Sequence, residues 1–99
     1  MDERALLRTA ADRLEALAAR STAGDWRIGG LLASRPEVIA HAEGVTEHVA
    51  EARAGTAAWI SALSPAVGPP LATWLRAADG NDPAALEVAR VLLERLPAT

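Results

Sequence analysis

The sequence contains no cysteine, which excludes disulfide bonds, thiolate nucleophiles and cysteine-ligated metal sites. This composition fits a reducing compartment. Phenylalanine and tyrosine are also absent, and the aromatic residues are three tryptophans. Much of the 51% apolar share is alanine, so large side chains are scarce. We therefore expect the tryptophans to contribute an unusual share of the core.

Lysine is absent as well, and acidic residues outnumber arginines by 13 to 10. A net charge of −3 exerts no long-range attraction on a phosphate backbone, which makes nucleic acid an unexpected partner. The N-terminal residues carry charges and lack the continuous apolar segment of a secretory signal, so we expect a cytoplasmic protein. With 99 residues, 1–99 should form a single domain.

Residues 2–20 have the apolar spacing of an amphipathic helix, which Ser21, Thr22 and Gly24 should end. From Asp25 the apolar period changes to two, which is typical of a strand. A turn at Ser34–Pro36 and a second short strand over 38–40 complete a predicted β-hairpin.

Residues 45–53 allow two interpretations. Apolar residues recur at helical spacing from Val45 to Leu63, which slightly favours one long helix. Against this, Glu43–Gly44 matches a hairpin turn, and Gly55 would cost the helix about 1 kcal/mol relative to alanine. Periodicity alone leaves both possibilities open.

The segment Ala57–Ala78 holds two of the three tryptophans with five other large apolar side chains, and no charge before Arg76. Prolines interrupt it at Ser64–Pro65 and Gly68–Pro70, because an internal proline removes a backbone donor and clashes with the preceding turn. A further helix should begin at Asp82–Pro83, a cap followed by a first-turn proline. The expected helices cover residues 56–63, 70–78 and 83–96.

We expect the indoles of Trp59 and Trp74 to point inward where the first two of these helices meet. Truncation of Trp74 to alanine should then cost about 3 to 5 kcal/mol. The complete predicted core consists of Leu14, Trp26, Trp59, Ile60, Leu63, Leu71, Trp74, Leu75 and Leu92.

Two stretches resemble a loose group of small proteins from actinobacteria and their phages and prophages. They are the linker Ser21–Trp26 and a later segment containing Ala57-Ala58-Trp59-Ile60, Leu63-Ser64-Pro65 and Leu71-Ala72-x-Trp74-Leu75. The group's linker commonly reads Thr-Pro-Gly-Pro-Trp, and both prolines are missing here. The resemblance implies a third strand over 47–52, and the group has no assigned activity. With it, the predicted fold is α+β: a two- to three-stranded antiparallel sheet within residues 25–52, packed against an N-terminal helix and three C-terminal helices.

One cluster has metal-ligand chemistry, and its members are His41, Glu43, Glu47, His48 and Glu51. Paired strands could bring two imidazoles and a carboxylate together, which is a competent set for zinc or nickel. The spacing of a His-Glu-x-x-His motif is absent. We therefore prefer solvated strand side chains, keep His41, His48 and Glu43 as candidate ligands, and expect no cofactor.

The residues that other functional classes require are missing from the sequence. Thr56, Ser61 and Ser64 match helix caps or solvated positions, and no Gly-x-Ser-x-Gly turn or phosphate loop is present, so we expect no enzyme. Prolines and polar residues argue against a membrane span over 57–75. A DNA-reading helix over 70–78 would offer only Arg76 as a cation.

The remaining hypothesis is a non-enzymatic interaction module with a protein partner or a second copy of itself. It would act through a sheet edge or an apolar helix face. Leu31 and Leu32 are further candidates for uncovered apolar residues. The alternatives are a nucleic-acid-associated regulator in a phage or prophage setting and a metal-binding protein that uses His41 and His48.

Overall fold

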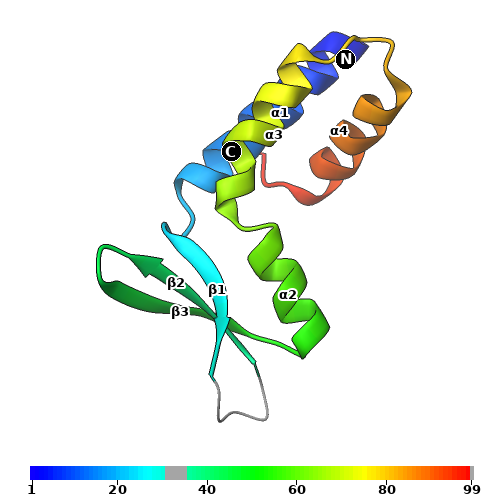
Figure 1. Ribbon diagram of the computed structural model, residues 1–99. Coiled ribbons are helices and arrows are strands. Elements are labelled where there is room, and N and C mark those ends of the chain that lie inside the picture. The colour runs from blue at the N-terminus through cyan, green and yellow to red at the C-terminus, as the bar shows by residue number, and fades with distance from the viewer. Residues whose placement is uncertain (31–35, 99) are drawn as a thin grey trace. The chain divides into compact units, whose positions relative to one another are not determined.

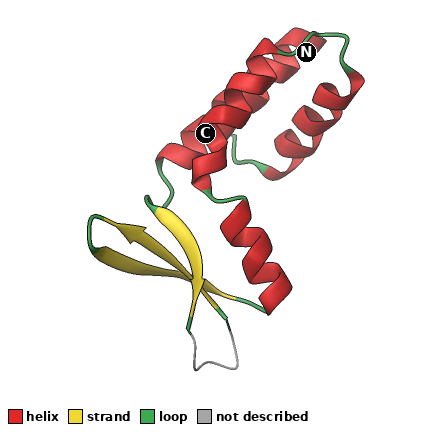
Figure 2. Cartoon of the chain, in the orientation of Figure 1, coloured by secondary structure: helices red, strands yellow, loops and turns green. Residues whose placement is uncertain are grey.

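The structure of the chain is a computed structural model that describes residues 1–30 and 36–98 (Figure 1). Its elements, in chain order, are α1 (Glu3–Ala19), β1 (Asp25–Gly29), β2 (Glu37–Ala42), β3 (Val45–Glu51), α2 (Ala54–Ala62), a short 3-10 turn (Pro65–Val67), α3 (Gly68–Ala77) and α4 (Pro83–Arg95). This order confirms the predicted α+β class: an N-terminal helix, a three-stranded antiparallel sheet and then helices (Figure 2).

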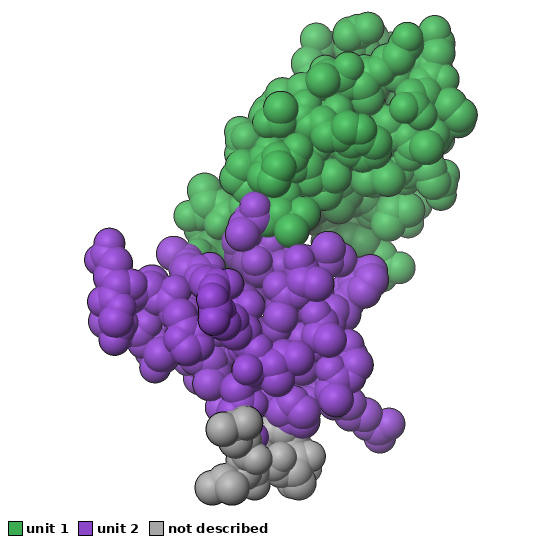
Figure 3. Space-filling model, in the orientation of Figure 1, with its two compact units in different colours: residues 1–21, 67–99 green, residues 22–66 purple. Residues whose placement is uncertain are grey.

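The chain forms two compact units (Figure 3). Residues 1–21 and 67–99 make the first, called the helical unit, which contains α1, α3 and α4. Residues 22–66 make the second, called the sheet unit, which contains the three strands and α2. The predicted turn at Ser34–Pro36 and the pair Leu31 and Leu32 involve positions outside the described residues.

Caps fix two of the helix starts in the helical unit. The Asp2 side chain accepts a hydrogen bond of 2.7 Å from the Ala5 amide at the start of α1. Asp82 accepts from the Ala84 amide at 3.0 Å, with Pro83 as the first residue of α4. Each cap satisfies amides that the helix itself leaves without an acceptor. The cap predicted at Asp82 is confirmed.

Helix α1 is the centre of the helical unit, because both α3 and α4 pack against it. Alanine dominates these contacts, and small side chains let helix axes approach closely. Leu7 and Leu75, which are 2% and 0% exposed, fill the remaining space. The buried cluster consists of Leu7, Ala10, Ala11, Ala72, Leu75, Ala85, Leu86 and Ala89.

In the sheet unit, β2 lies between β1 and β3, and both pairings are antiparallel. Glu43 and Gly44 form the β2–β3 turn with positive φ angles of 50° and 79°. Glycine adopts this backbone region without steric cost. The predicted hairpin turn is confirmed, and the alternative of one long helix through residues 45–53 is wrong. The third strand that the resemblance implied is present at Val45–Glu51.

One face of this sheet is covered by α2, which contacts β1 and β2. Val38 and Ala40 from β2 and Ala57 from α2 are fully buried there. Trp26 is half-buried, and its Nε1 donates to the Thr22 carbonyl at 3.0 Å. The indole nitrogen is thus satisfied, as a partly buried tryptophan requires.

Three predicted core residues are wrong: Trp59 is 67% exposed, Leu63 is 52% exposed and Trp74 is 43% exposed. Adjacent helical residues point about 100° apart, so Ala57 can face the sheet while Trp59 faces away. In α3, Ala72 and Leu75 are buried with α1, and Trp74 lies to one side of that contact. A helix contact lined by alanines has no room for an indole. The prediction that the tryptophans would be buried because they are large was therefore incorrect. Among the other predictions, Leu75 is buried, and the half-buried residues are Leu14, Trp26, Ile60, Leu71 and Leu92.

Candidate functional site

The outward side of α2 is an exposed apolar surface of the sheet unit. It consists of Gly55, Ala58, Trp59, Ala62 and Leu63, all of them exposed, and we call it the α2 face. Their spacing of three, four and seven residues places them along one side of a helix. The opposite side, through Ala57, packs toward the sheet.

This arrangement is unusual for a surface helix. From Ala54 to Ala62, α2 contains no charged residue, and its apolar side chains lie on every side. A helix with this composition is ordinarily buried all round. Exposed large apolar side chains that adjoin one another mark interaction sites more often than single ones do. Trp59 and Leu63, one turn apart, are such a pair.

The β3 edge of the sheet is less suited to pairing with another chain. The edge strand β3 carries Glu47, His48 and Glu51, and its register with β2 shifts between Val38 and Ile39. Charges and bulges are the usual means by which edge strands avoid adding a further strand. Of the two surfaces that the sequence suggested, the α2 face is therefore the better candidate.

Both histidines lie on the face of the sheet opposite the one that α2 covers. The register pairs His41 with Asp25 on one side and with Thr46 on the other. It pairs His48 with Ile39, two residues from His41 on β2, so the imidazoles share one face. His48 Nδ1 lies 3.6 Å from Glu37 Oε2, a carboxylate that the sequence did not suggest as its neighbour.

Two of the carboxylates expected near the histidines, Glu43 and Glu47, are elsewhere, whereas the strand register pairs Glu51 with Glu37, the neighbour of His48. Glu43 lies in the β2–β3 turn, and Glu47 pairs with Ala40, whose side chain lies on the face that α2 covers. Across residues 1–30 and 36–98, no three His, Cys, Asp or Glu side chains are grouped so that they could hold a metal ion. The pairing that brings the histidines to one face therefore separates them from Glu43 and Glu47.

In the helical unit, Arg76 forms ion pairs with two carboxylates of α1. Its Nη1 donates to Glu15 Oε2 at 3.1 Å and its Nη2 to Glu15 Oε1 at 3.0 Å, a two-bond fork. Nη2 also donates to Asp12 Oδ1 at 2.9 Å. These bonds, and then the charge of Arg76, lower the pKa of Glu15. The same two carboxylates raise the pKa of Arg76, which stays charged.

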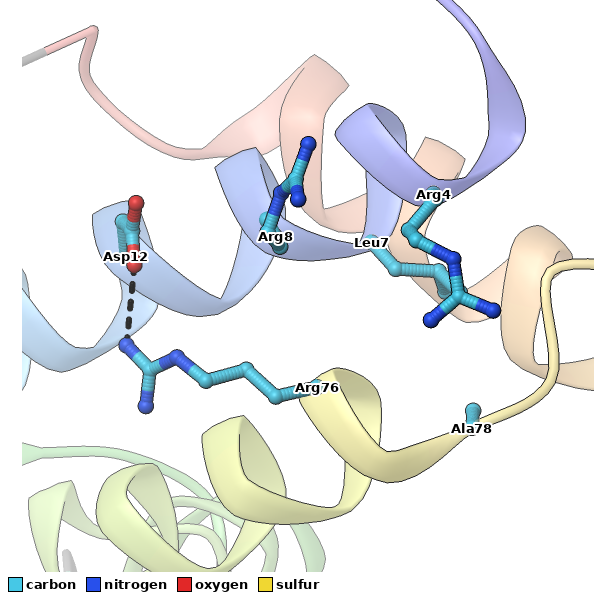
Figure 4. Close-up of a pocket in the computed structure, with 6 residues that line it drawn as sticks. All are labelled: Arg4, Leu7, Arg8, Asp12, Arg76 and Ala78. Atoms are coloured by element: carbon cyan, nitrogen blue, oxygen red, sulfur yellow. Dashed lines mark hydrogen bonds and ion pairs between the residues drawn. The ribbon is translucent and has the colours of Figure 1, made fainter.

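A cavity of about 160 Å³ lies beside this contact, between α1 and α3 (Figure 4). Its lining contains Leu7 and Ala78, the carboxylate of Asp12, and the side chains of Arg4, Arg8 and Arg76. Sequence reasoning missed this cavity, because nothing in the order of residues places Arg76 beside α1. The available signal was the spacing of Arg4 and Arg8, which lie one helical turn apart.

No helix in the described part of the chain is long and apolar enough to cross a membrane. Comparison with protein-family models, with curated proteins and with solved structures finds no match to this chain. The resemblance to small actinobacterial and phage proteins stays a prediction, and any function must be argued from the surfaces described above.

Proposed function

We propose that the chain is a non-enzymatic interaction module that associates with a second copy of itself through the α2 face. The single observation that supports this is the 67% exposure of Trp59 on a helix without charged residues. An indole has the largest apolar surface of any side chain, and leaving it in water forfeits much of its burial energy. A partner that covers it recovers that energy.

A second copy fits this face because the face is uncharged. A two-fold symmetric interface places the same surface patch on both subunits. A charged residue on that patch would therefore lie near the same charge on the other subunit. The α2 face presents no such charge. Two antiparallel copies of α2 would therefore meet without ion desolvation or repulsion.

The small residues of the α2 face leave room for the partner's indole. Gly55, Ala58 and Ala62 flank Trp59 on the same side of the helix. A methyl group added at Gly55 would meet no atom within 4 Å, so the space above it is open. In an antiparallel pair, Trp59 of each copy lies against the small side chains of the other.

The expected association is weak. Burying one tryptophan and one leucine from each copy gives roughly 2 kcal/mol for each side chain, or about 8 kcal/mol in total. Association costs about 4 kcal/mol or more in lost translational and rotational freedom. At the lower limit of that cost the balance is about 4 kcal/mol, which corresponds to a dissociation constant of about 1 mM, and further contacts would lower it.

Sedimentation equilibrium from about 1 µM to about 1 mM tests the proposal. The wild-type chain should dimerise as its concentration rises, and W59Q should stay monomeric with an unchanged circular dichroism spectrum. W74Q is the matched control, because it removes an exposed indole from a different helix. A wild-type chain that is monomeric throughout contradicts the proposal, as does a W59Q variant that dimerises like the wild type.

A further inference from the structure

The cavity in the helical unit combines an apolar floor with an unusual concentration of positive charge. Leu7, which is 2% exposed, and Ala78 supply the apolar part of its lining. Three of the six lining residues are arginines, and one is an acid. This charge is local, because the chain as a whole carries a net charge of −3.

Arg76 is already neutralised. Its guanidinium turns along the cavity toward Asp12, and Glu15 accepts two further hydrogen bonds from it (Figure 4). Arg76 therefore forms a fixed wall of the cavity and has little capacity to bind an added anion. The uncompensated charge belongs to the two arginines of α1.

Arg4 and Arg8 stand in positions that the helix itself disfavours. Arg4 lies in the first turn of α1, where the helix dipole is positive and repels a cation. Arg8 lies one turn later, and like charges at this spacing repel each other. Among the described residues, neither guanidinium has an ion-pair partner. An anion bound beside Arg4 would remove the first of these penalties and offset the second.

We infer that this cavity binds a small organic anion, a carboxylate joined to a short apolar group. The carboxylate is held by Arg4, whose guanidinium points toward the side of Ala78 (Figure 4), since guanidinium groups bind carboxylates through paired hydrogen bonds. Arg8, one turn away on α1, points in another direction and contributes its positive charge to the cavity lining. The apolar group lies over Leu7 and Ala78. This inference does not depend on the proposed self-association, which uses a helix of the sheet unit.

The size of the cavity limits the ligand. A volume of about 160 Å³ is well below the range of roughly 300 to 1,000 Å³ that accommodates drug-sized molecules and cofactors. A short-chain carboxylate fits this description, and a nucleotide does not.

Hexanoate is a suitable probe, followed by changes in the backbone amide resonances of the full-length chain during titration. We expect saturable shifts at Leu7 and Ala78, with tighter binding than acetate, which lacks the apolar group. Hexanamide keeps the chain length and removes the charge, so it should bind at least about tenfold more weakly. The double variant R4Q/R8Q should weaken hexanoate binding at least about tenfold.

The variant R90Q/R95Q is the control for lost charge, because it removes two arginines of α4 that do not line the cavity. It should bind hexanoate as the wild type does. Four results would overturn the inference: no saturable shift at Leu7 or Ala78, equal binding of hexanoate and hexanamide, equal binding of hexanoate and acetate, or R4Q/R8Q binding like the control. Amide spectra of both variants in the absence of probe establish that each is folded.

Discussion

Gly68 and Ala18 meet at a close contact between α3 and α1. A Cβ atom on Gly68 would lie 2.6 Å from the Cβ of Ala18, a separation that real Cβ atoms do not adopt. Both positions are fixed by helical backbone, so neither methyl group could rotate away. The first residue of α3 must therefore be glycine for the two helices to approach this closely.

The variant G68A should be destabilised by about 1 to 3 kcal/mol, because the added methyl group forces the two helices apart. G55A is the matched control, since a Cβ there meets nothing within 4 Å. Alanine should stabilise that position by about 0.5 to 1 kcal/mol. Urea denaturation followed by circular dichroism measures both. A G68A variant as stable as G55A would contradict the close contact.

Truncating Leu75 to alanine should destabilise the protein more than truncating its neighbour Trp74, although tryptophan is the larger residue. Leu75 is fully buried, and L75A should cost about 2 to 5 kcal/mol. Trp74 is 43% exposed, so W74A should cost less than L75A although the indole is larger. The free energies of unfolding of the two variants give the comparison. A larger loss for W74A would show that the indole is covered in solution.

The contact between Glu15 and Arg76 should make stability depend on pH in the acid range. Hydrogen bonds from Arg76, and then its charge, lower the pKa of Glu15 in the folded chain. The contact therefore stabilises the fold fully above the ordinary glutamate pKa of about 4.3, and this stabilisation is lost as the pH falls through the lowered value. The melting temperature of the wild type should exceed that of E15Q at neutral pH, and the difference should shrink below about pH 4.

E94Q, which removes a carboxylate of α4 outside this contact, controls for the change in net charge. A difference between wild type and E15Q that stays constant from neutral to acid pH would mean that the Glu15 side chain contributes no charged contact.

Replacing Ser61 by alanine should stabilise the protein. Its Oγ is buried, and no hydrogen-bond partner for it exists within the described residues. A buried hydroxyl without a partner costs about 1 to 3 kcal/mol, and alanine has the higher helix propensity. S61A should raise the free energy of unfolding by about 1 kcal/mol. A destabilised S61A variant would show that the hydroxyl finds a partner in solution.

Local chemistry explains which parts of the fold were predictable. The Asp82 cap, the prolines that separate α2 from α3, and the turn at Glu43–Gly44 all act within a few residues of themselves. The predicted helices and strands are correspondingly close to those observed. The stretch 45–53 was ambiguous because its apolar spacing suits a helix, and only pairing with β2 decides for a strand.

The candidate sites were less predictable, because each depends on residues that are distant in the sequence. The carboxylates near the histidines in sequence were expected to join them, whereas the strand register gives His48 a neighbour in Glu37. The arginine-lined cavity forms only when α3 packs on α1, more than sixty residues away. Trp59 is exposed because the sheet covers the other side of α2.

The sequence by itself determined the approximate bounds of most helices and strands of this protein, since caps, prolines and turn glycines act on their immediate neighbours, whereas residues 45–53 became a strand only by pairing with β2. Only the tertiary structure decided which sides of these elements are buried. Alanine-lined contacts such as that of α1 with α3 admit small side chains and exclude indoles, so the largest residues lie outside the core. The space between two packed helices sets which side chains fit, and this space depends on both helices together, so neither segment's sequence reveals it alone.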